Sequence, residues 1–329
     1  MELIRALRVG TWPLSLLFQA GVGLRNLAFD RGLFATQRVA ARVVSVGNLS
    51  VGGSGKTPLV AWLCAFLRGL GLRVGVVARG YGREPGATLN DEGMLLAARF
   101  PDLSQEQDGD RVAACERLIH RGALDVILLD DGFQHRRLAR DVDIVCIDAA
   151  SLDRPGLLLP AGDLREPRSS LRRADMVVLT RAGALDPPAL ARQRDRVRAL
   201  ARRAIPVHAA EHEALDVIDH PSKIASPPDS LRGRSVELLS AIARPKAFEA
   251  TVTHLGATVC VHHRRPDHHR HGVQEVERLA RDVAARGRLL LTTEKDAVKL
   301  AAVTAPFSFL RIALRFLGDA PTAAELGVA

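Results

Sequence analysis

Beyond residue 40, short apolar runs alternate with longer segments of helical periodicity. The apolar runs cover residues 43–47, 73–78, 125–129, 143–148 and 175–180, with helical patterns between them, notably over 57–70, 109–121 and 187–203. Uninterrupted apolar runs of this length are typical of strands that are buried on both faces. The pattern therefore predicts an α/β fold, with a doubly wound parallel sheet that carries helices on both faces.

A second, smaller α/β unit is predicted after a linker. Residues 215–234 are rich in proline, serine and charged side chains, as is typical of a linker. Beyond them, strands are expected near 236–240, 257–262, 288–292 and 307–313, and helices near 245–255 and 273–286. The predicted organisation is an N-terminal helical segment over 1–35, a larger domain over 36–214, the linker over 215–234 and a smaller domain over 235–329.

The N-terminal segment contains an uncharged run, residues 9–24, between Arg8 and Arg25. This run is shorter than the roughly 20 residues that span a bilayer, so a transmembrane helix is not expected. A helix with Thr11 as N-cap and Pro13 near its first position would carry one apolar face, formed by Leu14, Leu17, Phe18, Gly21 and Leu24. Periodicity alone leaves two alternatives open, an amphipathic helix in the membrane interface and an ordinary helix packed on the core.

Composition narrows the classes of partner. The chain has 329 residues, of which 46 are basic and 37 acidic, for a formal net charge of +9. Nucleic acid, anionic lipid and phosphorylated substrates all suit this charge, but an aromatic content of 4% argues against a base-stacking surface. The four cysteines are far apart and form no CxxC pair, which favours a reducing compartment over a zinc site or a disulfide framework.

The most informative segment is GNLSVGGSGKTP, residues 47–58, between the first predicted strand and an apolar helix. Glycines there let backbone N–H groups surround phosphate oxygens, while the lysine neutralises β- and γ-phosphates and the next hydroxyl holds Mg²⁺. Ser50 stands where the strict Walker A pattern has glycine, so the match is to the GGxGKT variant loops. The residues assigned to ATP or GTP are Val51, Gly52, Gly53, Ser54, Gly55, Lys56 and Thr57. A cleaved signal peptide with Arg5 and Arg8 as its basic n-region is disfavoured, because nucleotide chemistry needs cytosolic ATP.

A second signal is LLDDGFQH, residues 128–135, where an apolar strand ends in two adjacent carboxylates. An acid at the end of a strand beside the phosphate loop can hold Mg²⁺ directly or through water. Asp130 and Asp131 are therefore candidate metal residues, together with Thr57. A plain turn is the alternative, since Asp-Gly dipeptides form turns, and the nearby phosphate loop weighs against it.

These segments also carry a resemblance to a known family. In order along the chain, the matching segments are GNLSVGGSGKTP, ARGYGR (78–83), LDDGFQHRRLARDVDIVCID (129–148), LLPAGDLREP (158–167), PDHH (266–269) and LTTEKDAVKL (291–300). The chain resembles the tetraacyldisaccharide 4′-kinases, which phosphorylate the 4′-hydroxyl of a tetraacylated glucosamine disaccharide 1-phosphate in lipid A biosynthesis. The resemblance runs from about residue 10 to residue 315.

The family implies a P-loop α/β domain, a second α/β lobe that closes a cleft, and Mg²⁺-ATP. It also implies an N-terminal helix docked on the cytoplasmic face of the inner membrane, as in a peripheral or monotopic protein, which favours the interfacial alternative for residues 11–33. The implied partners are the acylated disaccharide and the cytoplasmic leaflet, with no nucleic acid and no obligate protein partner.

The family's site residues transfer by position. Lys56 and Thr57 match its phosphate and magnesium positions, and Asp130 and Asp131 match its acidic pair. Glu166 matches a further acidic residue near the metal, and Arg165 beside it is expected to contact phosphate.

The family's proposed general base, an acid in a GDEP-like segment, falls on Asp91, and the histidine that pairs with it falls on His268. Here Asn90 and Gly93 stand where glycine and proline are usual in the family. Phosphoryl transfer needs an acceptor hydroxyl in line with the γ-phosphate and one group to accept its proton, which a carboxylate oriented by histidine can do.

Three assignments stay open at this stage. His135 is either a structural hydrogen-bonding group or catalytic, and Lys295 either closes the cleft or lies on the surface. Five histidines crowd ten residues, namely His262, His263, His268, His269 and His271. A zinc site is not expected there, because neither cysteine nor helical i, i+4 spacing accompanies them.

Two functions from other classes remain as alternatives. One is a GGxGKT-type switch ATPase that acts through a protein or membrane partner, although Val51 stands where such loops often carry a lysine. The other is a membrane-binding scaffold that binds no nucleotide, against which the intact Lys56, Thr57 and Asp130 argue.

Overall fold

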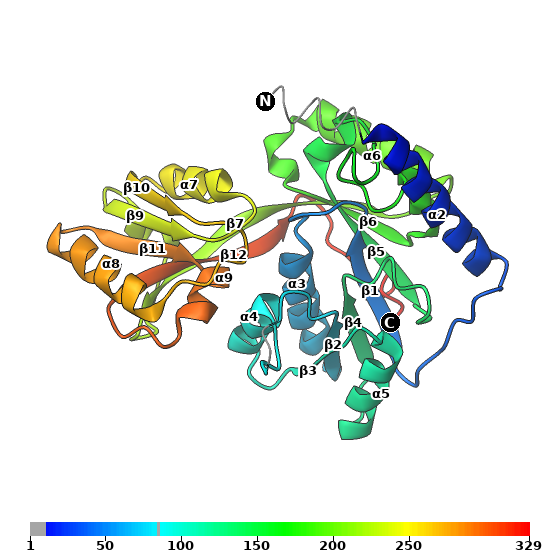
Figure 1. The fold of residues 1–329 in the computed structure, drawn as a ribbon, viewed down its shortest axis with the longest axis horizontal. Helices are drawn as coiled ribbons and strands as arrows, with labels where there is room; N and C mark the ends of the chain where they lie inside the picture. Colours follow the sequence, from blue (N-terminus) through cyan, green and yellow to red (C-terminus); the bar gives the residue numbers. More distant parts are fainter. Residues whose placement is uncertain (1–10, 84–85) are drawn as a thin grey trace. The chain divides into compact units, whose positions relative to one another are not determined.

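The computed structural model describes residues 11–83 and 86–329 (Figure 1). The first ten residues of the expected membrane segment, with the basic residues of a potential signal peptide, lie outside this description. Contacts divide the chain into two compact units. The first contains the residues up to Arg79, Leu103–Glu211 and Leu314–Ala329, and the second contains Gly80–Asp102 and His212–Ala313.

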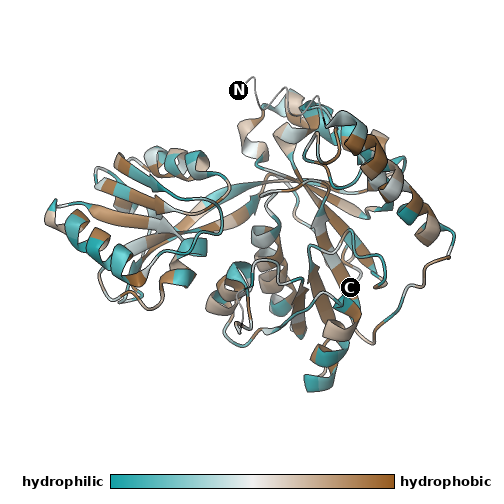
Figure 2. Ribbon diagram, viewed as in Figure 1, coloured by the Kyte–Doolittle hydropathy of each residue, from teal (hydrophilic) through white to brown (hydrophobic). Residues whose placement is uncertain are grey.

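A parallel sheet forms the centre of the first unit, with strand order β7-β6-β5-β1-β4-β2-β3. Its strands are β1 (Arg42–Asn48), β2 (Val74–Ala78), β3 (Ser104–Gln107), β4 (Val126–Asp130), β5 (Val142–Asp148), β6 (Met176–Thr180) and the beginning of β7 (Val207–His220). The five apolar runs expected from the sequence are all strands, coloured mostly as hydrophobic in Figure 2. The α/β fold with a mainly parallel sheet is thereby confirmed.

Helices cover both faces of this sheet. They are α3 (Lys56–Gly69), α5 (Arg111–Arg121) and α6 (Pro187–Ala201), with three short 3₁₀ segments, η1 (Ala149–Asp153), η2 (Arg168–Arg173) and η3 (Ala182–Ala184). One buried cluster joins Cys115 and Leu118 of α5 to Ile127 of β4. Another joins Val197 of α6 to Val177 of β6. Apolar strands are thus packed on two sides, as the unbroken runs require.

The helix α2 (Trp12–Asp30) begins where Thr11 and Pro13 predict it to begin. Its one buried side chain is Ser15, which donates to the Leu158 carbonyl at 3.1 Å and accepts from Ala161 N at 2.9 Å. Leu14, Leu17 and Leu24 of the predicted apolar face are 56%, 70% and 68% exposed, but Leu16 and Leu27 outside that face are exposed as well. The expected amphipathic division of this helix is therefore not confirmed.

No helix among residues 11–83 and 86–329 is both long enough and apolar enough to cross a membrane.

The second unit is built on a smaller sheet with strand order β10-β9-β11-β12-β7. Its further strands are β9 (Ser235–Ser240), β10 (Thr258–Arg264), β11 (Leu289–Thr293) and β12 (Phe307–Phe316). Strand β9 pairs in parallel with both β10 and β11, and β11 pairs in parallel with β12. Its helices are α4 (Asp91–Arg99), α7 (Pro245–His254), α8 (Val273–Ala285) and α9 (Glu294–Ala297), with the 3₁₀ segments η4 (Pro228–Leu231) and η5 (Val298–Leu300). Each strand and helix expected beyond residue 235 is present.

The unit boundaries differ from those expected. Residues 215–234 are not a linker, because they contain the end of β7, the short strand β8 (Ala225–Ser226) that pairs antiparallel with it, and η4. The expected larger domain loses residues 80–102 to the second unit. The end of the chain returns to the first unit, where Phe316 packs edge-on against Trp62 with ring centroids 4.9 Å apart.

Candidate active site

The glycine-rich loop connects the carboxyl end of β1 to α3. Gly55 has φ 87°, a left-handed conformation that favours glycine, and α3 begins at the next residue, Lys56. The loop is held from β6, since the Thr180 hydroxyl at the end of that strand donates to the Ser54 carbonyl at 2.8 Å. The Asn48 amide also donates to the Ser54 hydroxyl at 2.8 Å. The N-terminal N–H groups of a fourteen-residue helix thus open onto a fixed loop, which is the local structure that binds phosphate.

Gly47, at the end of β1, is required by close packing. A Cβ atom there would lie 2.4 Å from Cβ of Phe133, in the DDGF segment that follows β4. The Gln134 amide donates to the Asn48 carbonyl at 2.9 Å. These contacts hold the segment after β4 against the start of the phosphate loop.

Asp131 contacts two other predicted site residues, Arg165 and Lys56. Its carboxylate accepts two hydrogen bonds from the Arg165 guanidinium, at 2.8 and 2.7 Å, and one of its oxygens lies 3.4 Å from the Lys56 ammonium. Arg165 also donates to the Asn48 side chain. Burial raises the pKa of Asp131, but the hydrogen bonds of Arg165 and the charge of Lys56 outweigh it and hold the pKa well below its usual value. Asp131 is therefore an ionised anchor for two cations.

Asp130, the last residue of β4, is 4% exposed and lies opposite Val46 in the register with β1. The phosphate loop follows β1 directly, and Thr57 lies in the first turn of α3. A carboxylate and a hydroxyl are ligands that Mg²⁺ prefers. The donor types and their positions on neighbouring elements fit a magnesium ion bound together with nucleotide phosphates.

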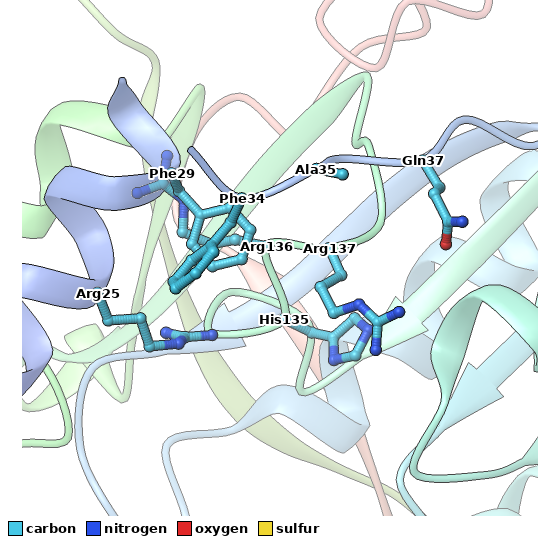
Figure 3. A pocket seen from close by; sticks show the side chains of 8 residues that line it. All are labelled: Arg25, Phe29, Phe34, Ala35, Gln37, His135, Arg136 and Arg137. Carbon is cyan, nitrogen blue, oxygen red and sulfur yellow. The ribbon is translucent and has the colours of Figure 1, made fainter. Parts of the chain in front are cut away.

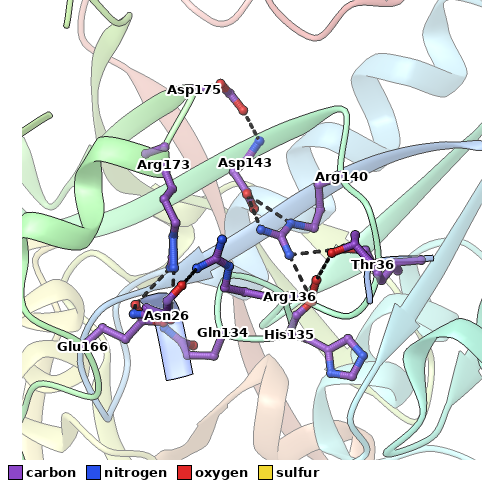
Figure 4. Close-up of polar contacts among 12 residues, drawn as sticks. Asn26, Thr36, Gln134, His135, Arg136, Arg140, Asp143, Glu166, Arg173 and Asp175 are labelled. Carbon is purple, nitrogen blue, oxygen red and sulfur yellow. Dashed lines mark hydrogen bonds and ion pairs between the residues drawn. The ribbon is translucent and has the colours of Figure 1, made fainter. Parts of the chain in front are cut away.

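Glu166, the third predicted acid, faces different partners. Its carboxylate is 1% exposed and accepts from the Asn26 amide of α2 and from the Arg173 guanidinium of η2, each at 3.0 Å (Figure 4). Within the described part of the chain, no three acidic, histidine or cysteine side chains gather as a metal site. The buried Glu166 carboxylate thereby attaches α2 to the loop that carries it.

In the second unit, the structure brings Asp91 and His268 together. Asp91 begins α4, is 4% exposed, and its carboxylate lies 3.2 Å from Nδ1 of His268. Asn90 caps α4 by accepting from Gly93 N at 3.0 Å, and its amide donates to the Tyr81 carbonyl at 3.0 Å. The two departures from the family segment, Asn90 and Gly93, are therefore partners in one helix cap.

Two cations near Asp91 were missed from the sequence. The Lys299 ammonium lies 3.8 Å from Asp91 and 2.6 Å from Asp296, and its side chain is 1% exposed. The Arg270 guanidinium lies 3.8 Å from the other carboxylate oxygen of Asp91. The available signal was the spacing of Asp296 and Lys299 inside LTTEKDAVKL, because opposite charges three residues apart can pair on one helical turn.

Lys295 and the other clustered histidines lie nearby in the second unit. The Lys295 ammonium is 3.5 Å from Nε2 of His268 and 3.4 Å from Asp267, so it contacts the histidine of the pair. His262 is hydrogen-bonded to Glu249 at 2.9 Å, and His263 is hydrogen-bonded to Glu237 at 3.0 Å. These two histidines therefore belong to separate pairs with acids.

His135 follows the acidic pair in the first unit. Burial lowers its pKa to about 4, and the positive charges of Arg111, Arg137 and Arg140 lower it further than Asp110 raises it. Its ring is therefore neutral at physiological pH. Within the described residues, its Nε2 atom is buried without a hydrogen-bond partner.

Comparison with known proteins identifies close relatives. The sequence pattern of the family described as tetraacyldisaccharide-1-P 4′-kinase matches residues 7–326. A tetraacyldisaccharide 4′-kinase of Anaeromyxobacter dehalogenans (strain 2CP-1) is 41% identical over 302 residues, which are 86% of this chain and 78% of the relative. That of Syntrophus aciditrophicus is 36% identical over 332 residues, covering 92% of this chain and 87% of the relative.

One solved structure resembles the whole fold. It is LpxK from Aquifex aeolicus, determined in complex with ATP, and it superposes with a TM-score of 0.75 at 29% sequence identity. The match covers 95% of this chain and 96% of that protein.

Proposed function

This chain belongs to the tetraacyldisaccharide-1-P 4′-kinase family, and from that premise we propose which of its residues bind ATP, hold Mg²⁺, accept the proton and contact the membrane. The chain is an ATP-dependent 4′-kinase that acts on a disaccharide precursor in lipid A biosynthesis. The finer substrate assignment, a tetraacylated glucosamine disaccharide 1-phosphate, is part of the proposal.

The phosphates of ATP are held by the loop Val51–Thr57 and by Lys56 and Arg165. The observation that carries this assignment is the Asp131 carboxylate, which fixes the Lys56 and Arg165 side chains beside the amino end of α3. Two fixed cations and the backbone N–H groups can neutralise charge that develops on the transferred phosphoryl group. Because Asp131 holds them before ATP arrives, little side-chain ordering remains for the binding step.

Thr57 and Asp130 would hold Mg²⁺. The ion supplies further positive charge to the phosphate oxygens when it is bound. Asp131, committed to Lys56 and Arg165, supports the site through those two cations, and Glu166 supports it through the loop that carries Arg165.

Asp91 accepts the proton of the acceptor hydroxyl, and His268 orients it. The 3.2 Å contact between them and the burial of Asp91 support this assignment. The Lys299 ammonium and the Arg270 guanidinium each lie 3.8 Å from an oxygen of the same carboxylate. Asp91 and His268 both belong to the second unit.

The helix α2 attaches the protein to the cytoplasmic leaflet of the inner membrane. Its support is the apolar surface of Leu14, Leu17 and Leu24, each more than half exposed. An anionic leaflet also attracts basic residues, and the chain carries a net charge of +9. Attachment of this kind is peripheral or monotopic, and it requires no protein partner.

The decisive experiment measures ATP turnover by the full chain with and without the acylated disaccharide. We expect ADP and phosphorylated acceptor in equal amounts, and loss of both in Lys56→Ala. The matched control is Lys246→Ala, because Lys246 is an exposed lysine far along the chain from the site residues. An ATP hydrolysis rate that is the same with and without the acceptor would instead support a switch ATPase. The whole-chain family match does not favour that alternative.

A further inference from the structure

A basic cavity lies beside α2, outside the residues assigned above to ATP and to the proton acceptor. Its volume is about 400 Å³, within the range of small-molecule sites. The main lining side chains are Arg25, Phe29, Phe34, His135, Arg136 and Arg137 (Figure 3). No carboxylate of the described residues lines it, so its charge is positive.

Two of the arginines are fixed by protein acceptors. Arg136 donates to Asp30 at 2.7 Å and to the Asn26 carbonyl at 2.9 Å, and its guanidinium lies 5.0 Å from the Phe29 ring centroid. Arg25 donates to the Gln134 carbonyl at 2.5 Å. These contacts hold α2 and the segment after β4 as two walls of the cavity.

Arg137 and the Nε2 atom of His135, which also line the cavity, have no hydrogen-bond partner among the described residues. Arg137 is exposed, and its guanidinium makes no hydrogen bond or ion pair with the described residues. His135 lines the same cavity with its Nε2 atom buried and unpartnered in the described part of the chain. The low pKa of His135, about 4, is explained by burial and by positive charges that include Arg137. The cavity thus offers hydrogen-bond donors and positive charge to an anion with several oxygen acceptors.

Apolar side chains adjoin this basic lining. Phe34, which lines the cavity, is 49% exposed, and its neighbour Leu33 is 73% exposed. Leu24, which precedes Arg25, is 68% exposed. A ligand that complements both the basic lining and these apolar side chains has an anionic headgroup and an apolar tail.

We propose that this cavity binds the phosphate group of an anionic bilayer lipid, with Arg137 as its donor and the lipid chains along Leu33 and Phe34. The proposal rests on the membrane attachment of α2 proposed above and adds a headgroup site to it. The lipid is a component of the bilayer and not the acceptor of the kinase reaction.

The test compares sedimentation of the full chain with phosphatidylcholine vesicles and with vesicles that also contain phosphatidylglycerol. A charge-assisted phosphate contact contributes roughly 1.5–3 kcal/mol, so we expect Arg137→Gln to weaken binding to the anionic vesicles about tenfold or more. Binding to neutral vesicles should not change. The matched control is Arg31→Gln, an exposed arginine at the end of α2 that does not line the cavity. The affinity of Arg31→Gln for the anionic vesicles should fall about fivefold at most, which is the effect of one arginine near an anionic surface.

A lysine variant separates a built site from a diffuse positive field. Lysine keeps the charge but not the planar pair of donors. Arg137→Lys should therefore still bind the anionic vesicles severalfold more weakly than the parent protein, whereas Arg31→Lys should bind them as tightly as the parent. Equal losses in the two glutamine variants, or full binding by Arg137→Lys, would overturn the proposal.

Soluble probes identify the source of the phosphate. A short-chain phosphatidylglycerol below its micelle concentration should raise the Tm of the parent protein but not that of Arg137→Gln, and inorganic phosphate should raise neither. Equal stabilisation by inorganic phosphate would assign the cavity to free phosphate and reject the lipid.

Kinase assays in detergent keep this proposal distinct from the proposed function. We expect Arg137→Gln to keep the parent kcat and the parent KM for the acylated disaccharide. A raised KM would mean that the cavity holds the acceptor itself, which rejects the bilayer lipid but not the kinase assignment. Failure of the parent protein to bind either vesicle, with kinase activity intact, rejects the membrane attachment and this site together.

Discussion

The side-chain amide of Asn26 in α2 lies 3.0 Å from the buried carboxylate of Glu166, the residue that follows Arg165. The helix α2 is thereby hydrogen-bonded to the loop that carries Arg165, a cation of the proposed nucleotide site. A hydrogen bond to a charged group contributes roughly 1.5–3 kcal/mol. We expect Asn26→Ala to lower the free energy of unfolding by about that amount, measured by urea denaturation, and to raise the KM for ATP.

Gln19→Ala is the matched control for Asn26→Ala, because Gln19 is exposed on the same helix. It should leave both the free energy of unfolding and the KM for ATP unchanged. An Asn26→Ala variant with parent stability would show that Arg173 alone satisfies Glu166.

Asp91 and His268 are expected to act as one unit in proton transfer. A positioned general base contributes typically 10²–10⁴-fold to the rate, so Asp91→Asn should lower kcat by a factor in that range, with little change in the KM for ATP. His268→Ala should lower kcat less. Because one unit cannot be lost twice, the double variant should be less impaired than the product of the two single losses. Full multiplication of the losses in steady-state assays would show that the two residues act separately.

Lys299 is expected to be important for stability, since its buried ammonium lies between Asp91 and Asp296. Removal of one partner from a buried ion pair leaves an uncompensated charge and costs about 3 kcal/mol or more. We predict this loss for Lys299→Ala in chemical denaturation. Lys246→Ala, at an exposed position, should not lose stability. A fully stable Lys299→Ala would mean that Arg270 and water compensate both carboxylates.

His135 predicts a pH dependence of stability. Its pKa is about 4 in the folded protein and 6.5 in an exposed histidine, so the unfolded chain binds more protons between these values. The stabilising contribution of neutral His135 is therefore complete above pH 6.5 and is lost as the pH falls toward 4. His135→Asn should flatten the plot of unfolding free energy against pH in this window. His254→Asn, at an exposed histidine, should leave the slope unchanged.

The apolar surface of α2 is expected to carry membrane binding. A fully buried leucine or phenylalanine gains about 1.5–3 kcal/mol, and Leu17 and Phe18 are 70% and 38% exposed. Leu17→Asp with Phe18→Asp should therefore release the protein from anionic vesicles in a pelleting assay. The control is Leu215→Asp with Ile224→Asp, two exposed apolar side chains of the second unit. Release by both double variants alike would point to non-specific hydrophobic adhesion.

The sequence predicted the elements in which the pattern of apolar residues along the chain agrees with burial in the fold. Val126–Asp130 and Val142–Asp148 are buried along their whole length and are apolar except at Asp130, Asp143 and Asp148, so strand and core position follow from one signal. The edge strand Ser104–Gln107 was missed because its four residues, SQEQ, are all polar. Residues 215–220 were assigned to a linker because prolines follow at 221 and 227, although the strand continues to His220.

The candidate site was predictable only in part. Lys56 and Asp131 could be found from the sequence, because each lies in a short motif whose residues have a characteristic spacing, the phosphate loop and the acidic pair. Glu166 bonds to Asn26, 140 positions earlier, and that pairing exists only in three dimensions. Lys299 was missed for a similar reason, since a lysine in a helical pattern is usually exposed and its contact with Asp91 exists only in the folded chain.

The chain passes between the two units four times, after Arg79, Asp102, Glu211 and Ala313. Neither unit is therefore one continuous stretch of sequence, and no single cut by a protease or in the gene releases one of them whole. The excursion Gly80–Asp102, which contains Asp91, is translated long before the residues from His212 onward that complete its unit. The pairing of Asp91 with His268 must consequently wait until most of the chain has left the ribosome.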